Sequence, residues 1–498
     1  MLEPIRRALY RWYTRLDQQI SRLHNDPLEI QSVSEAINDL PILSVDAISA
    51  QHDSEQADRV GFNPRQSELV IDLCATGNSP SYSRIPQFGV WRLQFGSFRQ
   101  QDFVPDGFVE LLSGSRVVEA RLMVQLPESA GPRVAAEYVV PLNDVYLLKG
   151  VQSVYWRAAT VIRRVIGGAL DGGLKEFVRK LSVTPTLGPS ELAAQSCGIR
   201  DLLRLVGKSG WRWLRYRIES ALYDEQWVLL YQLGVSSIKT CELEDLTQLA
   251  PARDRFWADP FVVAKNDVHH IFFEELVYSE GKGTIAHMSI EVDGSVSEPT
   301  TVLEKPYHLS YPFLFEYEDD LYMVPESAEN RSVDLYKSTD FPFGWTYIKT
   351  LISDEALYDA TLTSHGGRWW LFASREPDTF GTTSDELVIY HCDNPLTSDW
   401  TPLSRCPAVA DVRCARPAGD FFIEDDQQFR PAQDCSTRYG GAIDIRLVRS
   451  LSTSAYSDQS FRRIQPSQRS SILGVHTINA TSSIIIADAL VKKRRFLR

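Results

Sequence analysis

The stretch Trp257-Ala-Asp-Pro-Phe-Val-Val, followed after a polar turn by His269-His-Ile-Phe-Phe-Glu-Glu, decides the fold because the chain repeats it. Each copy is a mostly apolar strand, a short turn and an aromatic or aliphatic strand that ends in polar residues. Further copies begin at Ser310-Tyr-Pro-Phe, Tyr358-Asp-Ala-Thr, Ala415-Arg-Pro-Ala and Val475-His-Thr-Ile. Measured at Pro260, Pro312, Ala360, Pro417 and Thr477, the intervals are 52, 48, 57 and 60 residues. Periods near 50 with two or more strands per repeat are typical of propeller blades. The sequence therefore predicts a five-bladed β-propeller over residues 225–498.

Length and composition bound the remaining possibilities. A chain of 498 residues is too long for one compact core, so two or three domains are expected. The 52 Lys and Arg against 65 Asp and Glu give a net charge of −13, which argues against nucleic acid as a partner. Seven cysteines without a CxxC pair favour a reducing compartment over a disulfide scaffold or a zinc site. Arg6, Arg7 and Arg11 interrupt the apolar start of the chain, so we expect a cytoplasmic protein rather than a secreted one.

Residues 1–150 mix helical and strand signals. Ala8 to Leu23 has the apolar spacing of an amphipathic helix, and Glu68-Leu-Val-Ile-Asp-Leu-Cys is a short buried strand followed by a polar turn. Such a strand and turn suit a parallel α/β sheet. The predicted fold class is therefore multidomain, with an α/β domain, a helical linker and an all-β propeller.

Residues 151–224 are predicted to be a basic helical linker. Within 151–217 there are twelve Lys or Arg and four Asp or Glu, and the apolar spacing predicts helices over 158–169 and 202–217. Trp211-Arg-Trp-Leu-Arg-Tyr-Arg interleaves cations with aromatic rings. One interpretation is a patch attracted to anionic lipid or lipid-linked phosphate at the inner face of a membrane. The other, which the sequence favours, is a solvated connector whose arginine stems cover apolar surface.

The propeller repeats place polar side chains at matching positions. The start of each innermost strand faces one mouth of the central channel, so these residues should converge there: Asp259, Tyr311, Asp359, Arg416 and His476. Ends of second strands add Glu274, Glu275, Glu326 and Arg375. Carboxylates with an arginine and a histidine suit sugar recognition or glycosyl chemistry. The structural alternative is that Asp-Pro caps a turn and a glutamate pairs with Arg416 to close the channel. No ligand spacing supports a metal, and no cofactor is expected.

The same segments resemble a known family. Trp257-Ala-Asp-Pro, Ser310-Tyr-Pro, Val324-Pro-Glu-Ser and Asp359-Ala look like the propeller at the N-terminus of plant glucosamine inositolphosphorylceramide transferases. Bacterial proteins with similar repeats occur in polysaccharide gene neighbourhoods. More distantly, the architecture is similar to the arabinanase, levansucrase and invertase superfamily, whose first-blade Asp is matched by Asp259. Asp359 and Glu326 match only by approximate blade position, and the distant family's acid-bearing motif is not recognisable here.

Residues from about 10 to 150 resemble a methionyl-tRNA-formyltransferase-like domain through Gly89-Val-Trp-Arg-Leu-Gln-Phe-Gly-Ser and Pro105-Asp-Gly-Phe-Val-Glu-Leu-Leu. That family uses an Asn, a His and an Asp to position the formyl group and move protons. At the matching places this chain has Arg92, Gln94 and Ser129. The resemblance therefore implies a truncated domain in which formyl transfer is absent.

Three functions remain open from the sequence. The first is a carbohydrate-active enzyme, a glycosyltransferase-like protein of surface-polysaccharide or glycolipid biosynthesis that takes a sugar nucleotide or glycan. Its expected catalytic residues are Asp259, Glu326 and Asp359. Its expected substrate-binding residues are Trp257, Glu274, Tyr311, Arg375, Arg416 and His476. The second is a glycan-binding module without chemistry, and the third is a scaffold; a furanosidase-like glycoside hydrolase is a further alternative to the transferase.

Overall fold

The computed structural model describes residues 69–72, 85–96, 107–127, 129, 131–143, 145–181, 198–234, 237–377, 382–404, 406–467 and 470–495. The chain divides into two compact units, Met1–Leu214 and Arg215–Arg498, and each is described by itself. The helix predicted over residues 8–23 lies outside the described residues, as does the turn after residue 74.

The first unit contains a four-stranded sheet in the order β1-β2-β3-β4. Its strands are β1 (Val70–Asp72), β2 (Val90–Phe95), β3 (Val117–Gln125) and β4 (Arg133–Pro141), with α3 (Phe108–Ser113) between β2 and β3. β1 runs parallel to β2, as the predicted α/β sheet requires, whereas β2, β3 and β4 pair antiparallel. The sheet is therefore mixed rather than parallel. Arg92 and Gln94 lie on β2, and Ser129 Oγ lies 3.0 Å from the carbonyl oxygens of Leu126 and Gly131. The formyltransferase-like resemblance stays a prediction.

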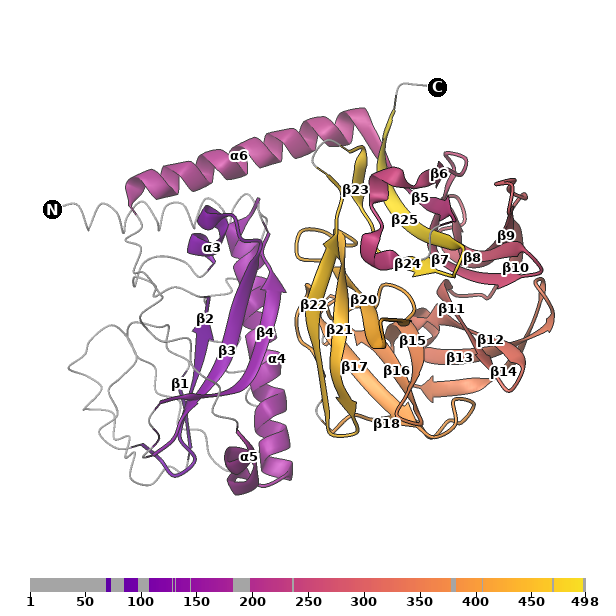
Figure 1. The fold of residues 1–498 in the computed structure, drawn as a ribbon. Coiled ribbons are helices and arrows are strands. Elements are labelled where there is room, and N and C mark those ends of the chain that lie inside the picture. The colour runs from indigo at the N-terminus through magenta and orange to yellow at the C-terminus, as the bar shows by residue number, and fades with distance from the viewer. Residues whose placement is uncertain are drawn as a thin grey trace. The chain divides into compact units, whose positions relative to one another are not determined.

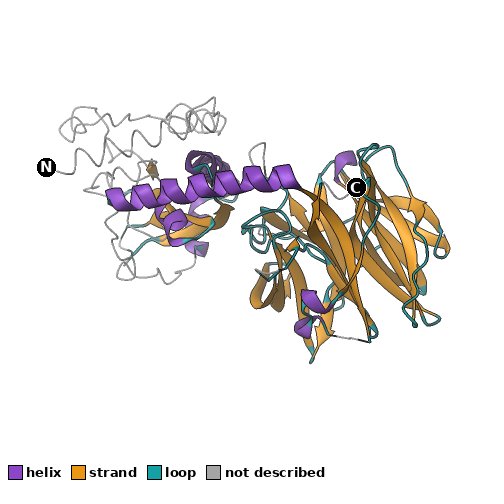
Figure 2. Cartoon of the chain, turned by 90° about the horizontal axis from the view of Figure 1, so that it is seen from above, coloured by secondary structure: helices purple, strands orange, loops and turns teal. Residues whose placement is uncertain are grey.

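The described residues that follow the sheet contain three helices: α4 (Leu147–Asp171), α5 (Leu174–Lys180) and α6 (Ile199–Leu222). They confirm both helices predicted for the basic segment. Ile162 and Ile166 of α4 are buried against Trp91 and Leu122 of the sheet. α4 therefore belongs to the core of the first unit, although its sequence was expected to form part of a linker. Figure 2 shows α6 as one long, uninterrupted helix.

The second unit consists of five antiparallel sheets. Blade 1 is β7 (Arg255–Lys265), β8 (Val268–Val277), β9 (Lys282–Glu291) and β10 (Thr300–Leu303). Blade 2 is β11 (Ser310–Tyr317), β12 (Asp320–Ser327), β13 (Ser332–Asp340) and β14 (Gly344–Ser353). Blade 3 is β15 (Leu357–His365), β16 (Arg368–Arg375), β17 (Glu386–Cys392) and β18 (Thr401–Pro402). Blade 4 is β19 (Phe422–Glu424), β20 (Gln427–Asp434), β21 (Ala442–Ser452) and β22 (Ala455–Ile464).

The fifth sheet is built from both ends of the unit. It contains β23 (Ile472–Gly474), β24 (Ile478–Ala480), β25 (Ile484–Arg494), β5 (Tyr223–Leu233) and β6 (Thr247–Leu249). β5 and β25 pair antiparallel along their whole length, from Leu233 with Ile484 to Tyr223 with Arg494. Val228, Leu230 and Ile485 of these strands are buried in one apolar cluster. The ring is therefore closed by backbone hydrogen bonds between segments far apart in the sequence.

The first strands of the sheets lie next to one another, as in a propeller. β7 contacts β11 and β24, and β11 contacts β15 (Figure 1). Ile478 N donates to Ala418 O, which joins the fourth and fifth blades. The five sheets match the five predicted repeats. The fourth repeat differs in detail, because residues 415–418 form only an isolated bridge, Pro417 with Ala432, before the short strand β19. Gly419 follows at a φ of 134°, which lies outside the extended conformation of a strand, so the pairing stops at this bridge.

Candidate functional site

Three first strands carry a β-bulge at the same place. The pairing between first and second strands shifts in each case around one residue with a positive φ: Asp259 at 50°, Tyr311 at 42° and Asp359 at 53°. Non-glycine residues rarely adopt this left-handed conformation, which costs about 1–3 kcal/mol. A bulge re-aims the side chain it carries and is often found beside active sites. The repeated bulges define one structural position, at which the sequence had placed these same three residues.

The bulge also frees a backbone N–H, and a carboxylate of the preceding blade accepts it in two of the three cases. Asp259 N donates to Asp488 Oδ2 at 3.0 Å, and Asp359 N donates to Glu326 Oε2 at 3.2 Å. Asp488 lies on β25 and Glu326 on β12, both second strands of their repeats. Each acid therefore links one blade to the next as well as lining the centre.

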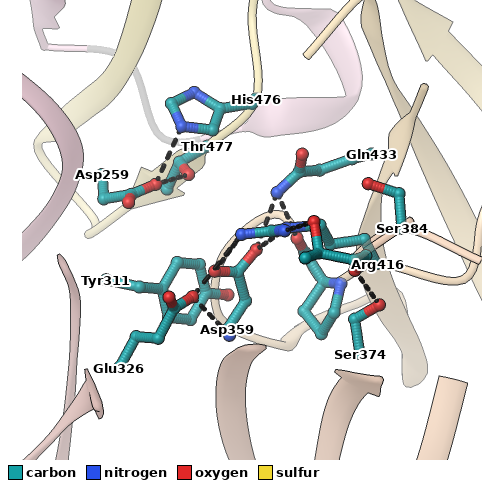
Figure 3. Close-up of polar contacts among 12 residues, drawn as sticks. Asp259, Tyr311, Glu326, Asp359, Ser374, Ser384, Arg416, Gln433, His476 and Thr477 are labelled. Atoms are coloured by element: carbon teal, nitrogen blue, oxygen red, sulfur yellow. Dashed lines mark hydrogen bonds and ion pairs between the residues drawn. The ribbon is translucent and has the colours of Figure 1, made fainter. Parts of the chain in front are cut away.

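Arg416 and Asp359 form the first of two charged clusters (Figure 3). Arg416 Nε lies 2.6 Å from Asp359 Oδ2, and Nη2 lies 3.1 Å from Oδ1, so the pair is bidentate. Arg416 Nη2 also lies 3.5 Å from Glu326 Oε2, and Gln433 Nε2 donates to Asp359 Oδ2 at 2.8 Å. The cluster therefore joins blades 2, 3 and 4.

Burial governs the electrostatics of this cluster. Asp359 is 1% exposed and Arg416 is 5% exposed. Burial raises the pKa of Glu326 well above its ordinary value, and the neighbouring Asp359 carboxylate adds to this, while Arg416 opposes it. Although burial opposes the charged guanidinium, Asp359 holds the pKa of Arg416 well above its usual range. The arrangement favours a proton on Glu326 and a permanent charge on Arg416.

Asp259, His476 and Asp488 form the second charged cluster. His476 Nδ1 lies 2.7 Å from Asp488 Oδ2, and His476 Nε2 lies 3.3 Å from Asp259 Oδ1. Thr477 Oγ1 donates to Asp259 Oδ1 at 2.6 Å. Although burial opposes it, the two carboxylates, Asp488 first, raise the pKa of His476 to about 9. Burial raises the pKa of Asp259 to about 7, with His476 acting against the shift.

The second cluster has ligand atoms that could hold a metal ion. One atom from each of Asp259, His476 and Asp488 lies within 4.8 Å of the others. A metal requires the neutral imidazole, whereas these carboxylates favour the imidazolium. The contacts therefore describe an Asp-His-Asp ion cluster, in which a metal ion would have to displace the proton of His476 before the ring could bind it.

Tyr311 of blade 2 is fully buried and forms hydrogen bonds with residues of blades 3 and 4. Its hydroxyl lies 2.8 Å from Thr361 Oγ1 and accepts a hydrogen bond from Gly419 N at 2.8 Å. Burial raises the pKa of Tyr311 well above its ordinary value. These contacts engage the hydroxyl that was expected to bind substrate.

The remaining sequence-predicted residues contact other partners. Glu274 Oε1 lies 3.1 Å from His308 Nε2, and in addition to burial the charge of Glu274 helps to raise the pKa of Asp259. Trp257 Nε1 donates to Glu275 Oε1 at 2.9 Å, and the Trp257 ring packs on Phe273 at 5.4 Å. Arg375 Nη2 lies 3.2 Å from Glu386 Oε2. The structure thus brings Asp259, Glu326, Asp359, Arg416 and His476 into the two charged clusters, and places Trp257 and Arg375 in separate ion-pair or packing contacts.

A cavity of about 340 Å³ lies beside the two clusters. Its lining residues come from blades 1, 4 and 5: Glu225, Trp227, Phe256, Tyr278, Arg438, Tyr439 and Leu490. The Trp227 ring packs on His476 at 4.1 Å, and Arg416 Cζ lies 5.0 Å from the centre of the Tyr439 ring. Trp227 and Tyr439 therefore line the cavity and also contact residues of the two charged clusters.

The sequence did not reveal several of these residues. Asp488 and Gln433 lie on second strands, at the positions that correspond to Glu326 in its own repeat, so aligning the repeats could have identified them. Thr477 adjoins His476 in the fifth copy. Aligning the repeats could not have identified Trp227 or Tyr439 as site residues. Trp227 lies on β5, which precedes the repeats, and Tyr439 lies in the turn between β20 and β21, which does not recur in the other repeats.

The fold and centre define a five-bladed propeller with a buried carboxylate, arginine and histidine core. Residues 236–471 match the family model described as glucosamine inositolphosphorylceramide transferase 1, N-terminal. The chain is 34% identical over 206 residues to glucosamine inositolphosphorylceramide transferase 1 of Oryza sativa subsp. japonica, which covers 41% of this chain and 27% of that protein. The propeller is thus similar to the N-terminal part of that family, and the chain spans about a quarter of the curated relative's length.

Two glycoside hydrolases are among the solved structures to which the chain is similar. The catalytic domain of the Coprinopsis cinerea GH62 alpha-L-arabinofuranosidase is 13% identical, covers 54% of this chain and 98% of its own, and has a TM-score of 0.38. Zg3597, a family 117 glycoside hydrolase of Zobellia galactanivorans, is 11% identical, covers 54% of this chain and 90% of its own, and has a TM-score of 0.35.

Proposed function

We propose that the propeller binds a saccharide headgroup in the cavity beside its centre, as part of glycosyl transfer to a lipid or a polysaccharide. The observation that carries this proposal is the aromatic wall formed by Trp227, Phe256, Tyr278 and Tyr439 around about 340 Å³. That volume lies in the range of small-ligand sites, which are mostly apolar with a few polar groups. Arg438 and Glu225, 2.6 Å apart, supply polar groups at the same cavity.

The charged centre supports binding more than catalysis. Glycosidic chemistry needs one carboxyl that reaches the bond as an acid and a second, separate carboxylate. Asp359 accepts two hydrogen bonds from Arg416 and another from Gln433, and Asp259 accepts one from Thr477. Acids held this way are engaged in contacts within the protein, and neither of them lines the cavity.

The family match supports a role in glycolipid or surface-polysaccharide synthesis. The Oryza relative is named a transferase, and the shared region corresponds to an N-terminal domain of that family. We infer that this chain shares the role of that domain rather than the activity of the whole relative. A glycan or glycolipid headgroup is the first candidate ligand, and a sugar nucleotide is the second.

Glycosyl transfer or hydrolysis at the centre itself is a second candidate function. The observation that favours it is Glu326, whose pKa burial raises well above the ordinary value, so that the carboxyl holds a proton beside Asp359. A protonated acid next to a second carboxylate is the pattern of a general acid. In that case Glu326 would donate the proton, with Asp359 and Asp259 as the charged partners.

Ligand-observed NMR on the full chain tests the binding function. The probes are N-acetylglucosamine, myo-inositol 1-phosphate and UDP-N-acetylglucosamine, each alone. Tyr278→Ala removes one wall of the cavity at a side chain that is 47% exposed, so folding should survive. Tyr347→Ala is the matched control, because Tyr347 is 49% exposed and lies on β14 away from the cavity lining.

The expected result is saturation transfer to at least one probe in the wild type and in Tyr347→Ala, and its loss in Tyr278→Ala. No transfer to any probe, or equal transfer in both variants, would count against the cavity. The catalytic candidate has its own readout, which is release of sugar or nucleotide from these probes. Turnover that disappears in Glu326→Gln while binding persists would replace the binding function with the enzymatic one.

A further inference from the structure

The helix α6 has an exposed apolar stripe opposite its buried side. Leu202 and Leu205 are buried, at 4% and 0% exposure. The stripe contains Leu203, Trp211, Leu214, Ile218 and Leu222, all between 42% and 67% exposed. From Trp211 onward these residues are three or four positions apart, so they share one face of the helix. Large apolar side chains gathered on one exposed face mark an interaction surface.

Cations border this stripe. Arg200, Arg204 and Lys208 are spaced four residues apart, and Arg215 lies four residues after Trp211. Over residues 199–222 there are six Lys or Arg and two Asp or Glu, within a chain whose net charge is −13. One of the two acids, Glu219, is already engaged by Arg215 at 2.9 Å and Lys492 at 3.0 Å. The exposed face is therefore both apolar and positively charged.

We propose that α6 lies in the headgroup region of an anionic lipid bilayer. Among the described residues, no helix is long and apolar enough to cross a membrane, and Lys or Arg recurs along α6 from Arg200 to Arg217. An interfacial helix needs an apolar stripe, flanking Lys or Arg, and aromatic residues at the level of the headgroups. Tryptophan and long arginine side chains suit that level, because each joins an apolar body to a polar tip.

The arrangement of charges on α6 favours a negatively charged membrane surface as the binding partner. Each Lys or Arg near an anionic surface strengthens its attraction, and the cations here run along the helix instead of gathering around one point. A row of cations beside an apolar stripe complements a continuous negative surface. A second copy of α6 would place its own cations against these, which is unfavourable.

Flotation of the full chain with vesicles tests the proposal. One set contains phosphatidylcholine alone, and the other contains phosphatidylcholine with phosphatidylglycerol. Trp211→Gln with Ile218→Gln removes two exposed apolar side chains, and Arg200→Gln with Arg204→Gln removes two cations. Ile423→Gln with Phe461→Gln is the control, because these side chains are 74% and 51% exposed on blade 4.

The wild type and the control should float with the anionic vesicles and much less with phosphatidylcholine alone. The Trp211/Ile218 variant should bind at least about tenfold more weakly, since two buried side chains are lost from the bilayer. The Arg200/Arg204 variant should lose affinity chiefly at low salt. Absence of flotation, equal flotation of all variants, or a concentration-dependent dimer that the Trp211/Ile218 change abolishes would each overturn the proposal.

Discussion

Arg416 donates two hydrogen bonds to Asp359, from Nε to Oδ2 at 2.6 Å and from Nη2 to Oδ1 at 3.1 Å. These bonds connect the fourth blade to the third. Both side chains are almost completely buried. A buried charge without its partner is far more costly than the intact pair is stabilising. The pair is therefore sensitive to the loss of either member.

Arg416→Met should lower the free energy of unfolding by about 3–5 kcal/mol, because Asp359 is left buried and unpaired. Urea unfolding measures the loss. Arg368→Met is the control, since Arg368 pairs at 3.2 Å with the exposed Asp393 and should cost less than about 1 kcal/mol. Equal costs for the two variants would show that the central pair does not hold the blades together.

Gly419→Ala should destabilise the propeller by about 2–4 kcal/mol, because φ is 134° and an added Cβ would collide with Ile478 O of the next blade. Gly367→Ala is the control that measures the cost of the positive φ alone, without a steric clash. Gly367 has a φ of 73° and open space around the added carbon, so about 1 kcal/mol is expected. Thermal unfolding of both variants measures the difference between their destabilisations. Equal destabilisation by the two changes would show that the added Cβ at position 419 meets no close contact with Ile478 O.

Tyr311→Phe should cost about 1–3 kcal/mol, since the buried Gly419 N–H would lose its acceptor and Thr361 Oγ1 would keep only its hydrogen bond to Asp359 O. Tyr347→Phe removes a hydroxyl 3.1 Å from Thr350 Oγ1 at an exposed site and should be nearly neutral. Chemical unfolding distinguishes the two. A neutral Tyr311→Phe would mean that water or a rearrangement replaces the lost hydrogen bonds.

The propeller should become less stable as the pH rises above neutrality. The folded state raises the pKa of His476 from 6.5 to about 9, because Asp488 and Asp259 outweigh burial. The resulting stabilisation is complete below pH 6.5 and is lost as the pH rises through about 9. Its size is on the order of 3 kcal/mol. The raised pKa of Asp259, from 3.8 to about 7, also lowers stability as the pH rises, but it does so between these two values and therefore below the pH range in which His476 acts.

Unfolding free energies measured from pH 6 to about pH 10 test this dependence. His476→Gln should be less stable than the wild type at pH 6, and its stability should decline less across the range. A parallel decline in both proteins would assign the effect to other groups.

The sequence located the bulge residues because the repeats are local. Asp259, Tyr311 and Asp359 occupy one register in successive copies, and each copy folds as strands adjacent in the chain. Strict alternation along a strand would place Trp257 and Asp259 on the same face. The bulge breaks that alternation, so Trp257 contacts Glu275 within its blade whereas Asp259 reaches His476. The sequence repeat therefore predicted the position of these residues along the strand, whereas the β-bulge determines the direction in which their side chains point.

The sequence by itself determined the number of blades and the residues that open each one, because antiparallel neighbours close in sequence leave a visible repeat. The tertiary structure alone decided the pairing of charges and the cavity. Arg416 meets Asp359 across 57 residues, and β5 pairs with β25 from opposite ends of the propeller. Such contacts depend on how the blades close into a ring, and Trp227 reaches His476 only through that closure.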